Sequence, residues 1–324
     1  MKTHLIKPIC AVGWRLPLGR LVAPRRPVVL MYHGIPRRDA AEVDARALEV
    51  QMEFLKRHFE VVSPRDLFQK RAAAAPVRVA ITFDDGYRNV AEVAAPVLQR
   101  LGIPALFFVC TRPSAPGKYL WFAYFEALRR HFSGTALRFR GQVWDLSEPN
   151  RRDTIQRLRE YVLALRPHPA AMYEAIEKEL PPIEEFVSPA DLQDRYAGMT
   201  EAQIRTLAAD PLFAFGVHTV DHPMLTFCSP DEMVRQIQEN KSWIERVSGR
   251  PCEAIAYPRG DYNAEVVDAC VRLGLKVGYA VTPTRKVSPP FEVPRIGIYR
   301  PSLDIVGFKV IYGQTLRALG VPLG

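Results

Sequence analysis

The order of the predicted elements along the chain constrains its fold more than any other feature. Short apolar runs of strand length alternate with amphipathic stretches of helical spacing, and a polar turn follows each run. Strand, turn and helix repeated in this way predict a parallel sheet covered by helices. The predicted strands are 28–32, 78–83, 105–109, 213–217, 253–257, 277–281 and 291–298. The predicted helices between them are 45–59, 89–101, 229–247 and 263–273.

Reactive side chains fall where these predicted strands end. They are His33, Asp84 with Asp85, His218, Arg259 and Arg295. In a closed barrel of alternating strands and helices, the carboxyl ends of the parallel strands meet on one face, where active sites lie. An open doubly wound sheet would hold these residues less compactly, and the sequence has no Gly-rich phosphate loop to support one. We therefore expect an α/β fold of the distorted (β/α) barrel type.

The regular alternation of predicted strands and helices is interrupted after residue 111. The helical stretches that follow are joined by Pro-rich turns, and together they are too long for a plain loop. They lie at 121–132, 152–165 and 171–180. We expect an inserted helical subdomain that shapes substrate access, contacts a partner, or only stabilises the barrel. The expected division is a basic tail (1–26), a barrel (27–111 and 212–300), the insertion (112–211) and a C-terminal tail (301–324).

Two segments far apart in the chain together suggest a metal site. The segment 82–86 reads TFDDG and places two adjacent carboxylates after a strand, and the segment 218–222 reads HTVDH. One Asp and two His make a three-ligand set, and the other Asp is left free for proton chemistry, as metal-assisted hydrolysis requires. Each segment alone has a simpler interpretation, because Asp-Asp-Gly is typical of solvated turns and paired histidines are common on surfaces.

These motifs resemble those of the polysaccharide deacetylase family, the NodB-homology or carbohydrate esterase 4 group. The segment 82–86 matches the family's first motif, and 218–222 matches its His-Ser/Thr-x-x-His motif. The segments 257–263 (YPRGDYN) and 31–35 (MYHGI) are similar to the family's bacterial exopolysaccharide branch. The resemblance covers the expected barrel and leaves the insertion and both tails outside. It implies a seven-stranded NodB-like barrel that hydrolyses the amide of an N-acetylated sugar.

The resemblance also implies roles for individual residues. A divalent metal would be held by Asp85, His218 and His222, and Asp84 would be the general base. Two imidazoles and a carboxylate suit Zn²⁺ best, and Co²⁺, Mn²⁺, Fe²⁺ and Ni²⁺ are compatible with them. A backbone N–H of the third motif would help to hold the oxyanion. The residues expected to contact the substrate or the oxyanion are Tyr257, Pro258 and Arg259.

The sequence departs from the better-known members at the groups that serve the base and the acid. The Arg that would orient the base is absent, because Ala256 stands at its position, and Arg295 is the candidate replacement from another strand. No histidine follows His222, so the family's late general-acid His has no counterpart. His33 is our candidate acid, and Asp84 returning its proton is the alternative.

Composition bears on partners and location. The net charge is +9, from 44 Lys+Arg against 35 Asp+Glu, but no basic stretch with interleaved aromatics marks a nucleic-acid partner. No apolar run reaches transmembrane length and no secretory signal is recognisable, so we expect a cytoplasmic protein. Its basic segment 1–26 could lie on the inner face of the membrane. The five cysteines form no C-x-x-C pair and indicate reduced, buried thiols.

We therefore expect a metal-dependent hydrolase that removes N-acetyl groups from an amino sugar in a polysaccharide or a lipid-linked glycan. Its place would be in exopolysaccharide or lipid-linked glycan synthesis. A deformylase or another amide hydrolase of the same fold is the alternative within this class. The alternative from another class is a carbohydrate-binding pseudoenzyme. The free carboxylate of Asp84 argues against it, because a binding module needs no base.

Overall fold

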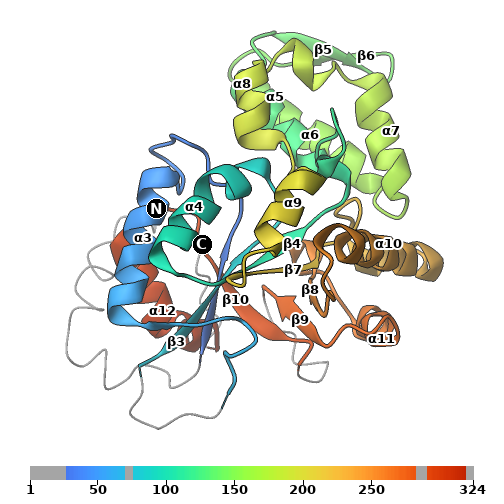
Figure 1. Ribbon diagram of the computed structural model, residues 1–324. Helices are drawn as coiled ribbons and strands as arrows, with labels where there is room; N and C mark the ends of the chain where they lie inside the picture. The colour runs from blue at the N-terminus through green and yellow to red at the C-terminus, as the bar shows by residue number, and fades with distance from the viewer. Residues whose placement is uncertain (1–26, 70–75, 282–289, 319–324) are drawn as a thin grey trace.

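Seven parallel strands form a closed barrel with helices around it (Figure 1). A computed structural model describes residues 27–69, 76–281 and 290–318. In it β1 pairs with β3 on one side and with β10 on the other, which closes the ring in the order β1-β10-β9-β8-β7-β4-β3. The bounds are β1 (Val28–Tyr32), β3 (Arg78–Phe83), β4 (Ala105–Val109), β7 (Phe213–Val217), β8 (Ala254–Ala256), β9 (Val277–Ala280) and β10 (Val293–Gly297). A short strand, β2 (Glu60–Val61), pairs with the start of β3. The predicted seven-stranded barrel is confirmed.

Amphipathic helices pack on the outside of this barrel. They are α3 (Ala45–His58), α4 (Ala95–Leu101), α9 (Glu201–Ala208), α10 (Pro230–Ser248), α11 (Ala264–Arg272) and α12 (Leu303–Ala318). Local sequence sets the ends of α10: the Ser229 side chain accepts from the N–H of Glu232, and Gly249 ends the helix at a left-handed φ of 67°. The helix α12 occupies the segment predicted as a C-terminal tail, and Val306 and Val310 join the core between barrel and helices.

The barrel strands turn alternate side chains inward and toward the helices. Val29 belongs to the cluster inside the barrel, whereas its neighbour Leu30 belongs to the cluster shared with the helices. On β10, Val293 is in the interior cluster, so Arg295, two residues later, points inward as well. Arg295 therefore lies in the middle of its strand and not at the predicted strand end. Its long side chain reaches from the middle of β10 to Asp84, which follows the end of β3.

A second core belongs to the segment inserted between β4 and β7, which lies to one side of the barrel (Figure 1). Its elements are α5 (Trp121–His131), β5 (Ala136–Phe139), β6 (Gln142–Asp145), α6 (Arg151–Ala164), α7 (Pro169–Glu179) and α8 (Pro189–Asp191). The hairpin of β5 and β6 differs from the all-helical prediction. Its two-residue turn is Arg140-Gly141, both at positive φ, and Gly141 alone is too weak a signal in the sequence. The helix α9, which falls in the predicted insertion, packs on β7 and α10, and Ile204 and Leu207 belong to the barrel's outer core.

Four cysteines in the described part of the chain carry free thiols, as predicted, and three of them are buried: Cys110, Cys252 and Cys270. Cys10 and the rest of the basic segment 1–26 lie outside the described residues. Among the helices that the structure describes, none is long and apolar enough to cross a bilayer.

Candidate active site

The two carboxylates of segment 82–86 follow β3, and a tight turn gives them different partners. Asp85 takes a left-handed conformation at φ 71°, and Gly86 continues it at φ 76°. The left-handed conformation costs a non-glycine residue about 1–2 kcal/mol, so other contacts must hold Asp85 there. At position 86 only glycine fits, because a Cβ would lie 2.5 Å from Cγ1 of Val109. The turn places Asp84 against an arginine and Asp85 against two histidines.

Arg295 binds Asp84 through two parallel hydrogen bonds. Nη1 donates to Oδ1 at 2.6 Å, and Nη2 donates to Oδ2 at 2.8 Å. Both side chains are buried, with Arg295 0% exposed and Asp84 3% exposed. Burial by itself raises the pKa of Asp84, but the Arg295 guanidinium, helped by His218 and His33, outweighs it and holds that pKa below its usual value. Asp84 is therefore an ionised carboxylate with a defined orientation.

Asp85 lies against two imidazole rings. Its Oδ1 is 3.3 Å from Nε2 of His218 and 3.5 Å from Nε2 of His222. Nδ1 of His218 is 2.8 Å from the carbonyl oxygen of Ala256, so in the neutral ring Nδ1–H donates to that carbonyl and the Nε2 lone pair faces the carboxylate. Two lone pairs at this separation repel each other unless a proton or a metal ion lies between them. The geometry therefore calls for a cation at this point.

The residues present fit a divalent metal as that cation. Asp85 Oδ1 is buried and accepts no hydrogen bond from the described residues. Burial lowers the pKa of His222 to about 3, which keeps its ring neutral and able to donate a lone pair. Burial also opposes a charged His218, but Asp84 and Asp85 outweigh it and raise the His218 pKa. One carboxylate and two imidazoles are the three protein ligands typical of a catalytic zinc site.

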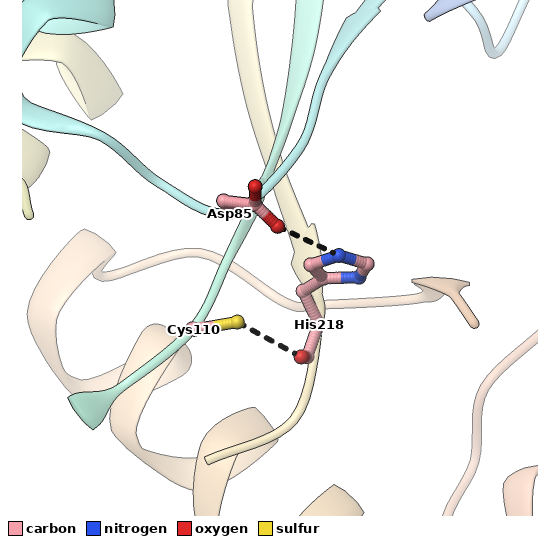
Figure 2. A group of neighbouring side chains, drawn as sticks. All are labelled: Asp85, Cys110 and His218. Atoms are coloured by element: carbon pink, nitrogen blue, oxygen red, sulfur yellow. Dashed lines mark hydrogen bonds and ion pairs between the residues drawn. The ribbon is translucent and has the colours of Figure 1, made fainter. Parts of the chain in front are cut away.

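Cys110 is a further potential metal ligand beside Asp85 and His218 (Figure 2). Asp85, Cys110 and His218 each offer one ligand atom within 4.8 Å of the others, so this buried group could hold a metal ion. The Cys110 Sγ donates to the carbonyl oxygen of His218 at 3.1 Å, and burial together with nearby carboxylates raises the thiol pKa well above its ordinary value. The sequence motifs assign Cys110 no role in the site. Its position directly after β4 is the signal that could have identified it.

Backbone strain is concentrated around these side chains. Five non-glycine residues of the described chain have positive φ, and four of them are Asp85, Thr219 (69°), His222 (53°) and Arg259 (56°). Such conformations cost about 1–3 kcal/mol each and persist only where the surroundings impose them. Thr219 supplies one of these restraints, since its Oγ1 accepts from the N–H of His222 at 3.0 Å.

The insertion holds the histidine loop from the other side. Nε1 of Trp121 donates to the carbonyl oxygen of His222 at 3.3 Å, and the Tyr173 hydroxyl donates to that of Asp221 at 2.8 Å. The ring of Phe122 packs edge-on against His222, with centroids 4.9 Å apart. The insertion thus positions a candidate ligand, a role that none of the three sequence interpretations included.

The third predicted segment, 257–263, follows β8, and its first side chain is buried. The ring of Tyr257 is buried in the core and stacks on Tyr262 with centroids 4.5 Å apart, and its hydroxyl donates to the carbonyl oxygen of Phe291 at 3.1 Å. This side chain is committed to the core, which corrects the expectation that it contacts substrate. Pro258 has no N–H. The next residue, Arg259, is exposed and has a left-handed conformation, and its N–H remains our candidate for holding the oxyanion.

His33 directly follows β1, where the carbonyl oxygen of Tyr32 accepts from the N–H of Asp84 at 3.0 Å, so His33 lies beside Asp84. Its Nδ1 is buried and has no hydrogen-bond partner in the described part of the chain. The structure therefore brings together Asp84, Asp85, His218, His222, Arg295 and His33 at one end of the barrel.

Known proteins share both the sequence pattern and the fold. A family model described as polysaccharide deacetylase matches residues 72–129 and 186–278. YxkH of Bacillus subtilis (strain 168), a protein named for the same family, is 19% identical over 264 residues, which make up 80% of this chain. The match spans 66% of YxkH, just under two thirds of its length.

Two solved structures illustrate the shared fold. IcaB from Ammonifex degensii has a TM-score of 0.57 at 17% identity, covering 89% of this chain and 98% of IcaB. The Streptococcus pyogenes deacetylase PplD, solved in complex with acetate, has a TM-score of 0.53 at 19% identity, covering 85% of this chain and 95% of PplD. At these identities the likeness establishes the fold and leaves the substrate open.

Proposed function

Because this chain belongs to the polysaccharide deacetylase family, we propose that it is a metal-dependent hydrolase that removes N-acetyl groups from an amino sugar. The amino sugar would belong to a polysaccharide or a lipid-linked glycan. One observation carries the proposal: Asp85 Oδ1 lies within 3.5 Å of Nε2 of both His218 and His222, beside a separate ionised carboxylate, Asp84. Ligands and base are distinct groups, as hydrolysis of an amide requires.

The residues divide the attacking half of the reaction between them. A divalent metal, Zn²⁺ in the first place, would be held by Asp85, His218 and His222, and when bound it supplies Lewis acidity to the acyl carbonyl and to water. Asp84 takes the proton from the water that attacks the acyl carbon. Arg295 keeps Asp84 ionised and fixes both of its oxygens, so the base is ready in the correct state.

Departure of the amine needs a proton donor and a stabilised oxyanion. His33 is the proposed donor because it lies beside Asp84, and Asp84, which has just received a proton, is the alternative. The N–H of Arg259 is proposed to hold the oxyanion from the strained turn after β8.

Two substitutions test this division. Asp84→Asn should bind metal as the wild type does and lose about 10²–10⁴-fold in acetate release, the usual contribution of a general base. His218→Ala should lose the metal itself, measured by elemental analysis after gel filtration. Asp268→Asn, an exposed carboxylate on α11, is the matched control and should change neither quantity.

The substrates should be N-acetylglucosamine oligomers and undecaprenyl-linked sugars, with acetate and formate measured separately. Release of formate in place of acetate would favour the deformylase alternative. Binding of glycans with no release of either acid would overturn the proposal and leave a carbohydrate-binding pseudoenzyme.

We further propose that the protein acts in exopolysaccharide or lipid-linked glycan synthesis, in the cytoplasm and at the inner face of the membrane. The basic composition of residues 1–26 is the support for membrane association. Fractionation of cells into cytosol and membrane, followed by a salt wash, tests this location. Recovery in the periplasm or the medium would contradict it.

A further inference from the structure

A pocket of about 690 Å³ opens beside the candidate active site. It lies among the segment after β1, the loop before α3, the end of α5 in the insertion, and the segment after β10. These contribute residues 33–35, 41–43, 129–130 and 298–300. His33 forms part of its wall, and it directly follows Tyr32, whose carbonyl oxygen accepts from the N–H of Asp84 at 3.0 Å. A sugar whose acyl group reaches Asp84 therefore has room to extend into this pocket.

The pocket carries two arginines whose charge is not neutralised. Arg129 is exposed and makes no ion pair or hydrogen bond with any residue that the structure describes. Arg300 is also exposed, and among the residues that the structure describes its guanidinium donates only to the carbonyl oxygen of Ala41, at 3.5 Å. By contrast, Arg130 forms ion pairs with several carboxylates and is satisfied within the protein.

The one carboxylate in the pocket does not cancel these charges. Glu42 is the binding partner of Arg130, and Arg195 lies 3.7 Å from its other oxygen. Burial raises the pKa of Glu42, although the two arginines oppose that effect. Among the described arginines of the pocket, Arg129 and Arg300 therefore keep donors that no carboxylate uses, and both side chains are exposed.

An aromatic ring, that of Tyr299, lines the same pocket and lies beside His33. Tyr299 is 49% exposed, and its ring centroid is 5.6 Å from that of His33. The ring folds over Gly297, where a Cβ would lie 2.5 Å from Cε2 of the tyrosine, so glycine is needed to seat it. A half-exposed aromatic ring offers part of its apolar surface to a sugar.

We propose that this pocket binds a phosphate group carried by the sugar that is deacylated, with Arg129 and Arg300 as its ligands and Tyr299 against the ring of the sugar. This inference rests on the proposed function and names the chemistry of its substrate. A phosphate monoester carries about two charges and three acceptor oxygens, so it can neutralise both guanidiniums, whereas one carboxylate neutralises one. A diphosphate linked at both ends also carries about two charges.

The test compares two sugars that differ only in this group: N-acetylglucosamine 1-phosphate and the neutral methyl glycoside of N-acetylglucosamine. KM is measured from acetate release, and Kd is measured by calorimetry on zinc-loaded Asp84→Asn protein, which removes turnover. The wild type should prefer the phosphorylated sugar. Arg129→Gln and Arg300→Gln should each reduce that preference by about tenfold or more, the effect of one charge-assisted contact.

Arg138→Gln is the matched control. Arg138 is likewise exposed, but it lies on β5 of the insertion outside the pocket. It should keep the wild-type preference and thereby exclude a general effect of net charge. Equal losses for both sugars in the two pocket variants, or an equal loss of preference in Arg138→Gln, would overturn the inference.

Undecaprenyl diphosphate-linked N-acetylglucosamine, presented in detergent, separates two sources of the phosphate. Arginine dependence with both phosphorylated compounds indicates a phosphate on any glycan, and dependence with the lipid-linked one alone indicates a lipid diphosphate. The two proposals also fail separately. Arginine-dependent binding without acid release leaves the pocket and removes the hydrolase. Acid release with no arginine-dependent preference leaves the hydrolase and removes the pocket.

Discussion

Replacing Arg295 with methionine should destabilise the barrel more than any surface change, because it leaves Asp84 as a lone buried charge. The two hydrogen bonds of this pair, at 2.6 and 2.8 Å, are both charge-assisted, and neither partner is exposed beyond 3%. Each such bond contributes about 1.5–3 kcal/mol. Breaking a buried pair by removing one partner costs about 3–5 kcal/mol, which agrees with that sum. We expect Arg295→Met to lower the free energy of unfolding by about 3–5 kcal/mol at pH 7.

The double variant Asp84→Asn/Arg295→Met tests the cause. Asparagine removes the unpaired charge, so the double variant should be more stable than Arg295→Met alone, although it carries one more substitution. Urea unfolding of metal-free protein, followed by circular dichroism, measures both. The reasoning is refuted if Arg295→Met costs less than about 1 kcal/mol, or if the two substitutions add without coupling.

The pH dependence of the free energy of unfolding provides an independent test of the same pair. In the wild type the folded-state pKa of Asp84 is depressed, so the stability from this pair is present above the unfolded pKa of about 3.9 and is lost as pH falls through the folded value. Without Arg295 the effect of burial remains and raises that pKa, so the folded variant takes up a proton on acidification. The stability gap between the two proteins should therefore narrow from pH 8 to pH 5, and a gap that widens would contradict the assignment.

Three further predictions concern the surroundings of the site. Tyr173→Phe leaves a carbonyl of the histidine loop without its buried donor, so zinc affinity should fall by about tenfold in a competitive titration, whereas Tyr161→Phe should not change it. Gly86→Ala should cost about 1–3 kcal/mol more in urea unfolding than Gly102→Ala, because both have positive φ but only position 86 lacks space for a Cβ. Cys110→Ala should keep one bound zinc per chain, and loss of that zinc would make the sulfur a required ligand.

Local pattern was enough to predict the barrel. The strands at 28–32, 78–83, 105–109 and 213–217 have the predicted bounds, because short apolar runs between turns are a property of neighbouring residues. Both ends of α10 were predictable for the same reason, because Ser229 and Gly249 cap the helix next to which they lie in the sequence. The hairpin of the insertion was missed for a local reason as well, since Arg140 takes a left-handed conformation that arginine rarely adopts.

The candidate ligands were also accessible from the sequence, but their environment was not. The segments 82–86 and 218–222 mark strand ends, and strand ends of a parallel barrel converge. The contacts that decide their chemistry join residues far apart in the chain. The Tyr173 hydroxyl is bonded to Asp221, and Cys110 lies against His218 across two neighbouring strands.

The sequence by itself determined that this chain forms a β/α barrel with two carboxylates and two histidines at its mouth. Only the tertiary structure decided that Asp84 is bound by Arg295, that Tyr257 is committed to the core, and that the insertion holds the histidine loop. The reason is that periodicity acts between neighbours, whereas closure of the ring sets which side chains meet across it. An inward arginine in the middle of β10 finds its carboxylate only when β1 joins β10 to β3.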